Sequence, residues 1–152
     1  MPAILEADRV VTRLRSAFNH DTDRHGLLQM AADLIREAGA PYTSVYLYML
    51  HGDMLELEAW SGRDTEHDRI PVGKGVCGTA VATGEDQNVG DVQGRENYIA
   101  CNLFTRSELV VLIRRGKQIL GQIDVDSDQV DPFTPEEVTA VRQVAEALAV
   151  LL

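Results

Sequence analysis

The spacing of the apolar residues changes at about Tyr42, and that change constrains the fold more than any other feature. Up to Ala38 they recur at steps of three and four, the period of an amphipathic helix; from Tyr42 they alternate, the period of a β-strand. The pattern predicts one helix from Ile4 to Phe18 and another from His25 to Ala38, with Gly39 as its C-cap. The residues expected on the two apolar faces are Ile4, Ala7, Val11, Leu14 and Phe18, then Leu27, Leu28, Ala31, Leu34 and Ile35.

The alternating region predicts two β-hairpins. YTSVYLYML and MLELEAW flank HGD, and ELVVLI and QILGQIDVDS flank a turn that contains Gly116. Between the hairpins we expect a short extended piece at RIPVG and a short helix at GVCGTAVATG, closed by Gly84. A brief strand or bend at DQNVGDV and a long loop over residues 93–106 follow. FTPEE predicts the start of a last helix, with Thr134 as N-cap and Glu137 three residues later.

Helices at both ends and hairpins between them predict an α+β fold, a single domain over residues 1–152. A net charge of −10 disfavours nucleic acid and anionic membranes as partners. Charged residues interrupt the apolar ones at the N-terminus, which is not typical of a secretory signal, and no run approaches the ~18 apolar residues of a membrane span. We therefore expect a cytoplasmic protein whose thiols are kept reduced.

The chain has two cysteines, and each has two interpretations. Cys77 follows Gly73 and Gly75 at the start of a short helix, where backbone N–H groups stabilise a thiolate; filling a gap in the core is the commoner use of a lone cysteine. Cys101 lies in NYIACNLFTRSE, among polar residues typical of a loop at a site. Arg106 could favour a thiolate there, but a thiol tucked under its own loop fits the pattern equally well.

Three acidic residues also stand out. Asp124 and Asp126 alternate with apolar residues in GQIDVDSD, so both carboxylates lie on one face of a strand. A solvated strand face is the usual outcome, yet adjacent like charges favour a cationic partner such as an amine, or a retained proton for acid catalysis. Glu108 begins a strand, where a solvated carboxylate is usual. The histidines and cysteines have no metal-ligand spacing, and phosphate-loop and serine-hydrolase motifs are missing, so neither a metal nor a cofactor is expected.

Taken together, RIPVGKGVCGTAVATGE, IACNLFTRSELVV and LGQIDVDSD followed by FTPEE resemble the GAF-domain free methionine-(R)-sulfoxide reductases. The resemblance covers most of the chain from Tyr42 onward. It implies a central antiparallel sheet of six strands flanked by helices. It also implies reduction of free L-methionine-(R)-sulfoxide to methionine through a cysteine sulfenic acid and a disulfide, with recycling by a thioredoxin-type reductant.

The resemblance assigns roles to the cysteines and acids. Cys101 matches the family's nucleophile, and Cys77 matches a candidate resolving thiol. Glu108, Asp124 and Asp126 match the carboxylates that bind substrate and donate a proton; Glu108 is the expected acid, and the two aspartates would hold the substrate's ammonium group.

Aromatic residues of the first hairpin are expected to wall the pocket. Tyr46 matches the family's pocket aromatic, and Tyr42 stands at the family's nearby tryptophan position. Trp60 could pack with Tyr46 against the methyl and thioether groups, although ordinary core packing of the hairpin explains both rings as well.

One position departs from the family. Many members carry a third cysteine shortly before RIP, where this chain has DTEHDRIPVG with His67 at about that place. The sequence thus resembles a two-cysteine variant, recycled through Cys77 or directly by an external thiol. The alternative function is a non-catalytic GAF sensor that binds a small ligand or partner. The terminal helix stripes are compatible with a homodimer, although covering the sheet is the simpler use of those faces.

Overall fold

The computed structural model describes residues 2–93 and 104–152. The described part contains four helices and six strands. In chain order they are α1 (Ala7–Asn19), α2 (Arg24–Arg36), β1 (Ser44–His51), β2 (Met54–Ser61), β3 (Arg69–Pro71), α3 (Gly75–Thr83), β4 (Gln87–Val89), β5 (Ser107–Arg115), β6 (Gln118–Ser127) and α4 (Pro135–Leu151). Both predicted hairpins, the short helix and the terminal helices are thereby confirmed.

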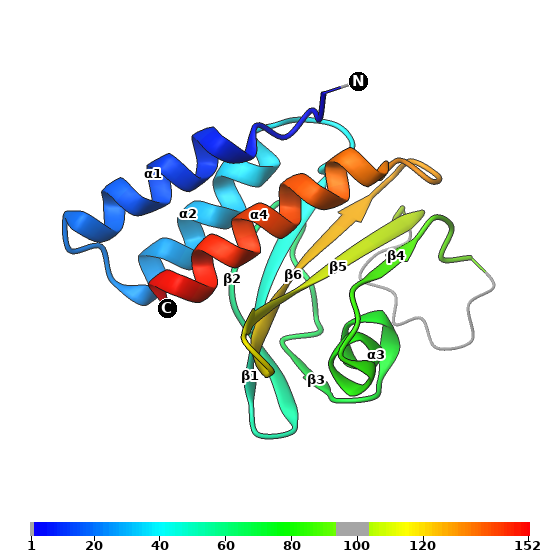
Figure 1. Ribbon diagram of the computed structural model, residues 1–152. Coiled ribbons are helices and arrows are strands. Elements are labelled where there is room, and N and C mark those ends of the chain that lie inside the picture. Colours follow the sequence, from blue (N-terminus) through cyan, green and yellow to red (C-terminus); the bar gives the residue numbers. More distant parts are fainter. Residues whose placement is uncertain (1, 94–103) are drawn as a thin grey trace.

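The strands form one sheet in the order β3-β2-β1-β6-β5-β4, and every neighbouring pair is antiparallel. The central pair, β1 and β6, brings the start of the first hairpin beside the end of the second. Helices α1, α2 and α4 lie on one side of the sheet and α3 lies on the other (Figure 1). The predicted α+β architecture with six antiparallel strands is therefore confirmed.

The larger core lies between the sheet and the three terminal helices. The residues of α2 expected to face the core are buried there. The expected face of α1 is only partly correct: Ala7 and Leu14 are buried as predicted, but Val10 is buried instead of Val11, and Ile4 and Phe18 are 52% and 46% exposed. The helix begins at Ala7, so its period does not extend back to Ile4, and Leu5 is the residue of that segment that enters the core.

Glu137 ties the N-terminal segment to the last helix. Thr134 caps α4 as predicted, because its hydroxyl accepts a hydrogen bond from the Glu137 N–H at 3.3 Å. The buried Glu137 carboxylate instead accepts hydrogen bonds from the backbone N–H of Ile4 at 2.7 Å and of Leu5 at 3.2 Å, and from the Tyr42 hydroxyl at 2.6 Å. Burial, reinforced by Glu137, raises the pKa of Tyr42.

A second core lies on the opposite face, between the sheet and α3. Close backbone packing fixes this helix: a Cβ at Gly78 would lie 2.5 Å from the carbonyl oxygen of Pro71. Gly84 ends α3 in the left-handed conformation at φ 70°, as its position in the sequence predicted. This packing holds Cys77 against β5 and β6. Among the described helices, none combines the length and apolar character needed to cross a membrane.

Candidate active site

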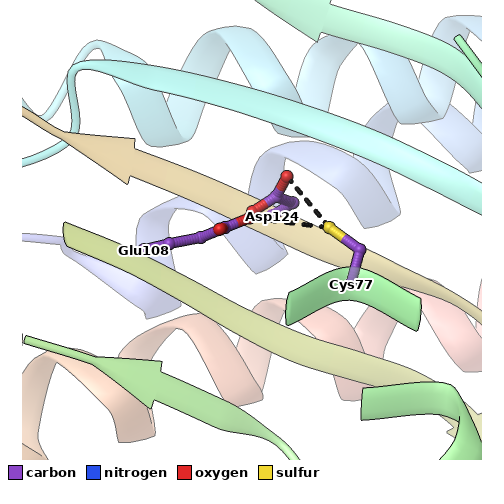
Figure 2. Close-up of side chains that lie close together, drawn as sticks. All are labelled: Cys77, Glu108 and Asp124. Carbon is purple, nitrogen blue, oxygen red and sulfur yellow. Dashed lines mark hydrogen bonds between the residues drawn. The ribbon is translucent and has the colours of Figure 1, made fainter. Parts of the chain in front are cut away.

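Three of the predicted site residues, from three separate elements, meet beneath α3. Cys77 comes from the first turn of α3, Glu108 from the start of β5 and Asp124 from β6 (Figure 2). The Cys77 thiol donates hydrogen bonds to Oδ2 of Asp124 at 3.2 Å and to Oε2 of Glu108 at 3.5 Å. All three residues are buried. The structure thus joins two of the predicted acids and one predicted thiol in a single cluster.

The register of the sheet explains why these acids share a face. Glu108 pairs with Asp126 across β5 and β6, and Asp124 pairs with Tyr46 across β6 and β1. Side chains of paired residues project to the same side of a sheet, so all four point toward the α3 side. The aspartates do not form the solvated strand face that is usual for such a pattern: Asp124 and Asp126 are 0% and 1% exposed.

Burial governs the ionisation of Asp124. Burial and, to a smaller extent, the charge of Asp126 raise the pKa of this carboxyl group, the hydrogen-bonding interactions with Glu108 and Cys77 lower it, and the net result is a pKa of about 7. A carboxyl group with a pKa near 7 can both donate and accept a proton at neutral pH. Asp124 is therefore suited to proton transfer with the adjacent thiol.

The cluster lines a narrow pocket with a volume of about 10 Å³, about the space of a single water molecule. Its described walls are His67, Ile70, Lys74, Gly75, Val76, Cys77, Glu108 and Asp124. His67 thus shares a pocket with Cys77, although their spacing in the sequence gave no reason to connect them. Tyr48 helps to hold that segment, because its hydroxyl donates to the His67 carbonyl at 2.6 Å.

The three aromatic residues predicted for the site lie in different places. Tyr46 is buried on the α3 side, where its hydroxyl donates to the Arg63 carbonyl at 2.7 Å. Trp60 pairs with Tyr46 across β1 and β2 but is 42% exposed, and its indole N–H donates to Asp64 at 3.2 Å. Tyr42 does not join the cluster: it lies in the helix-side core, 5.8 Å from Phe133 between ring centroids.

Two buried residues were missed by the sequence reasoning. Gln122 lies two residues before Asp124 on the same face, and its side-chain N–H donates to the Cys77 carbonyl at 3.1 Å. Tyr48 lies two residues after Tyr46 on the same face. The alternation that placed Asp124 and Tyr46 also applies to these two positions, so extending it by one step in each strand would have found them.

Cys101, the predicted nucleophile, lies outside the described residues. Its role and its relation to Cys77 therefore stay predictions.

The profile of the GAF domain matches residues 23–152 of the chain. The chain belongs to the GAF domain family. This match covers the sheet, α3 and α4, together with the cluster beneath α3.

Several relatives within this family are similar over long stretches. Free methionine-R-sulfoxide reductase from Escherichia coli is 39% identical over 105 residues, which are 69% of this chain and 63% of that protein. The solved type II free methionine-R-sulfoxide reductase from Thermoplasma acidophilum is 32% identical with a TM-score of 0.79, covering 93% of this chain and 94% of that chain. The Neisseria meningitidis free methionine-R-sulfoxide reductase in complex with its substrate is 30% identical with a TM-score of 0.85, over 95% and 87%.

The matches to curated relatives are shorter than those proteins. The aligned parts span 63%, 50% and 49% of the relatives from E. coli, Zymomonas mobilis and Bacillus subtilis. Together with the solved structures, these relatives support a common GAF fold.

Proposed function

We propose that this protein reduces free L-methionine-(R)-sulfoxide to methionine. The observation that carries the proposal is the buried cluster of Cys77, Glu108 and Asp124 beneath α3, in a GAF domain similar to reductases of that substrate. A thiol beside two buried carboxyl groups, of which Asp124 has a raised pKa, suits sulfoxide reduction, which needs a sulfur nucleophile and a proton for the sulfoxide oxygen.

The acids also suit the amino-acid part of the substrate. Asp124 and Asp126 are buried carboxylates, and a buried negative charge is stabilised by a cationic partner. The ammonium group of a free amino acid supplies that charge, whereas a methionine sulfoxide within a peptide has no such group. Tyr46 lies on the same face and could contact the thioether; a sulfur–aromatic contact contributes about 0.3–1.5 kcal/mol. Trp60 is the more exposed second candidate for that contact.

The first half of the reaction uses Cys101 and Glu108. The Cys101 thiolate attacks the sulfoxide sulfur, Glu108 acts as the acid that gives a proton to the sulfoxide oxygen, and the bond between sulfur and oxygen breaks as this oxygen is transferred to the Cys101 sulfur. Methionine leaves and Cys101 becomes a sulfenic acid, so the thiol is oxidised by two electrons and the sulfoxide is reduced by two.

The second half uses Cys77 and Asp124. The Cys77 sulfur attacks the sulfur of the Cys101 sulfenic acid, a disulfide forms, and water leaves. Asp124, 3.2 Å from the thiol, accepts the Cys77 proton during this attack. A thioredoxin-type dithiol then reduces the disulfide by exchange. The alternative route of recycling does not use Cys77: an external thiol attacks the Cys101 sulfenic acid directly.

The test is methionine release from the two separate epimers of free methionine sulfoxide, with dithiothreitol as reductant. We expect release from the R epimer alone, and none from the matched variant Cys101→Ser. Counting thiols before and after substrate gives a second readout: the reductase loses about two thiols per chain as a disulfide forms, by the exchange chemistry above. Normal turnover by Cys101→Ser would refute the assignment of Cys101 as the nucleophile. No release from either epimer would refute the activity and favour a GAF module that only binds a ligand.

A further inference from the structure

We propose that the cluster of Cys77, Glu108 and Asp124 is also a binding site for Zn²⁺ when the protein is reduced. One potential ligand atom from each residue, a sulfur and two carboxylate oxygens, lies within 4.8 Å of the other two. The three atoms come from α3, β5 and β6, so a rigid scaffold positions them (Figure 2). The spacing of cysteines and histidines in the sequence did not predict this site, because its ligands are far apart along the chain.

The distances are close to those of a zinc site. Zinc–sulfur bonds of about 2.3 Å and zinc–oxygen bonds of about 2.0–2.2 Å, at a tetrahedral angle, separate sulfur from oxygen by about 3.5–3.7 Å. Here the Cys77 sulfur lies 3.5 Å from the Glu108 oxygen and 3.2 Å from the Asp124 oxygen. A shift of a few tenths of an ångström would bring both pairs to ideal geometry.

The second oxygen of Asp124 is a separate observation that favours cation binding. Asp124 is fully buried, and its Oδ1 atom has no hydrogen-bond partner among the described residues. Leaving a buried carboxylate oxygen without a partner costs free energy, which a bound cation would offset. The net charge of −10 also attracts cations to the molecule.

The ligand set selects the class of metal. A thiolate with carboxylates suits Zn²⁺, whereas Mg²⁺ prefers oxygen ligands only, at octahedral geometry. Three protein ligands leave the fourth zinc position open to the pocket that His67 and Lys74 also line. Binding releases the Cys77 proton and converts the thiol into a metal thiolate.

Zinc in this position would block the reaction. It would occupy the acid Glu108 and hold the sulfur of Cys77 away from a sulfenic acid. This consequence, reversible inhibition of the reductase, rests on the proposed function, whereas metal binding itself does not.

The test titrates the full reduced chain with Co²⁺, a spectroscopic substitute for Zn²⁺, in the presence of a non-thiol reductant. We expect one equivalent to bind, with a thiolate-to-cobalt absorption band that Zn²⁺ abolishes and Mg²⁺ leaves unchanged. Cys77→Ser should lose the thiolate-to-cobalt absorption band and weaken Co²⁺ binding by more than about 100-fold. This loss exceeds that typical of replacing a residue that only supports a metal ligand. Glu108→Gln should weaken binding without loss of the fold, which circular dichroism checks.

A variant remote from the cluster controls for other ligands. Glu136→Gln, which changes an exposed acid at the start of α4, should bind like the original chain. The absence of a one-equivalent site would overturn the proposal, as would a band that survives in Cys77→Ser. Neither result touches the proposed activity, which is measured separately in chelator-treated protein.

Discussion

The Cys77 sulfur donates a hydrogen bond to Oδ2 of Asp124 across 3.2 Å, on the face of the sheet that α3 covers. This contact links a thiol on a short helix to a carboxyl group on a central strand. Burial is the main cause of a pKa of about 7 for Asp124, so the protonation state of this carboxyl group changes near neutral pH. The two side chains therefore form a unit whose proton content depends on pH.

The raised pKa of Asp124 predicts how stability depends on pH. An ordinary aspartate titrates near 3.8 and this one near 7, so between those values the folded state holds a proton that the unfolded state has lost. The contribution of Asp124 to the free energy of unfolding is therefore most favourable below about pH 4. It declines as pH rises toward 7, by an amount on the order of a few kcal/mol.

Asp124→Asn isolates that contribution because asparagine does not titrate. Urea unfolding at several values between pH 5 and 8 should show the original chain losing stability relative to the variant as pH rises. The substitution also changes the hydrogen bond from Cys77. This change shifts the free energy of unfolding by the same amount at every pH, so it does not create a pH dependence. If the stability difference between the two proteins were constant over this range, the raised pKa would be wrong.

The strands and helices follow from local patterns, and this explains why most of the fold could be predicted. Alternation in YTSVYLYML and QILGQIDVDS fixed the strands, and Thr134 with Pro135 marked the last helix. The same alternation placed both aspartates on one face. It could not say what covers that face, because α3 reaches it through contacts between residues distant in sequence.

The contacts of Tyr42 and Glu137 also depend on the tertiary structure. Tyr42 and Tyr46 are four residues apart, a spacing that would place both side chains on one face of a regular strand. However, β1 begins only at Ser44, so Tyr42 lies outside the strand. Tyr42 therefore packs in the helix-side core, and its hydroxyl donates a hydrogen bond to Glu137. Glu137 itself suggested only a helix start, since its long-range acceptor role depends on where the N-terminal segment lies.

Cys77→Ser tests the predicted resolving role. With a thioredoxin-type reductant, we expect one methionine per chain in a rapid burst and then a stall, because the Cys101 sulfenic acid has no internal thiol to condense with. Quenched-flow measurement of methionine release gives the burst and the subsequent rate. Continued turnover at the original rate would show that the external thiol attacks the sulfenic acid directly and that Cys77 has no resolving role.

Gly78→Ala tests whether α3 must lie this close to the sheet. An added Cβ would lie 2.5 Å from the Pro71 carbonyl oxygen, so the helix must move and carry Cys77 away from the carboxylates. We expect a loss of about 1–3 kcal/mol in the free energy of unfolding, as for other overpacked sites, and lower turnover. Ala82→Ser on the exposed side of the same helix is the control and should change stability by less than about 0.5 kcal/mol. Unchanged stability in Gly78→Ala would contradict the tight packing.

Glu137→Gln tests the buried contact that joins the N-terminal segment, Tyr42 and α4. The carboxylate accepts three hydrogen bonds, two from backbone N–H groups and one from the Tyr42 hydroxyl. The neutral amide replaces one acceptor oxygen by a donor, which leaves buried donors facing each other. We expect a loss of about 1–3 kcal/mol in the free energy of unfolding, the usual cost of an unsatisfied buried polar group.

A double-mutant cycle with Tyr42→Phe separates the hydroxyl contact from the backbone contacts. Tyr42→Phe alone should cost about 0.5–1.5 kcal/mol, and it should cost less in the Glu137→Gln background, because part of its partner is already lost. Glu136→Gln, one residue earlier and exposed, controls for the charge at the start of α4 and should change stability by less than about 0.5 kcal/mol. Strictly additive effects of the two mutations would mean that the hydroxyl and the carboxylate contribute independently to stability. Since this contact lies on the opposite face of the sheet from Cys77, methionine release by the folded Tyr42→Phe variant should remain near that of the original chain.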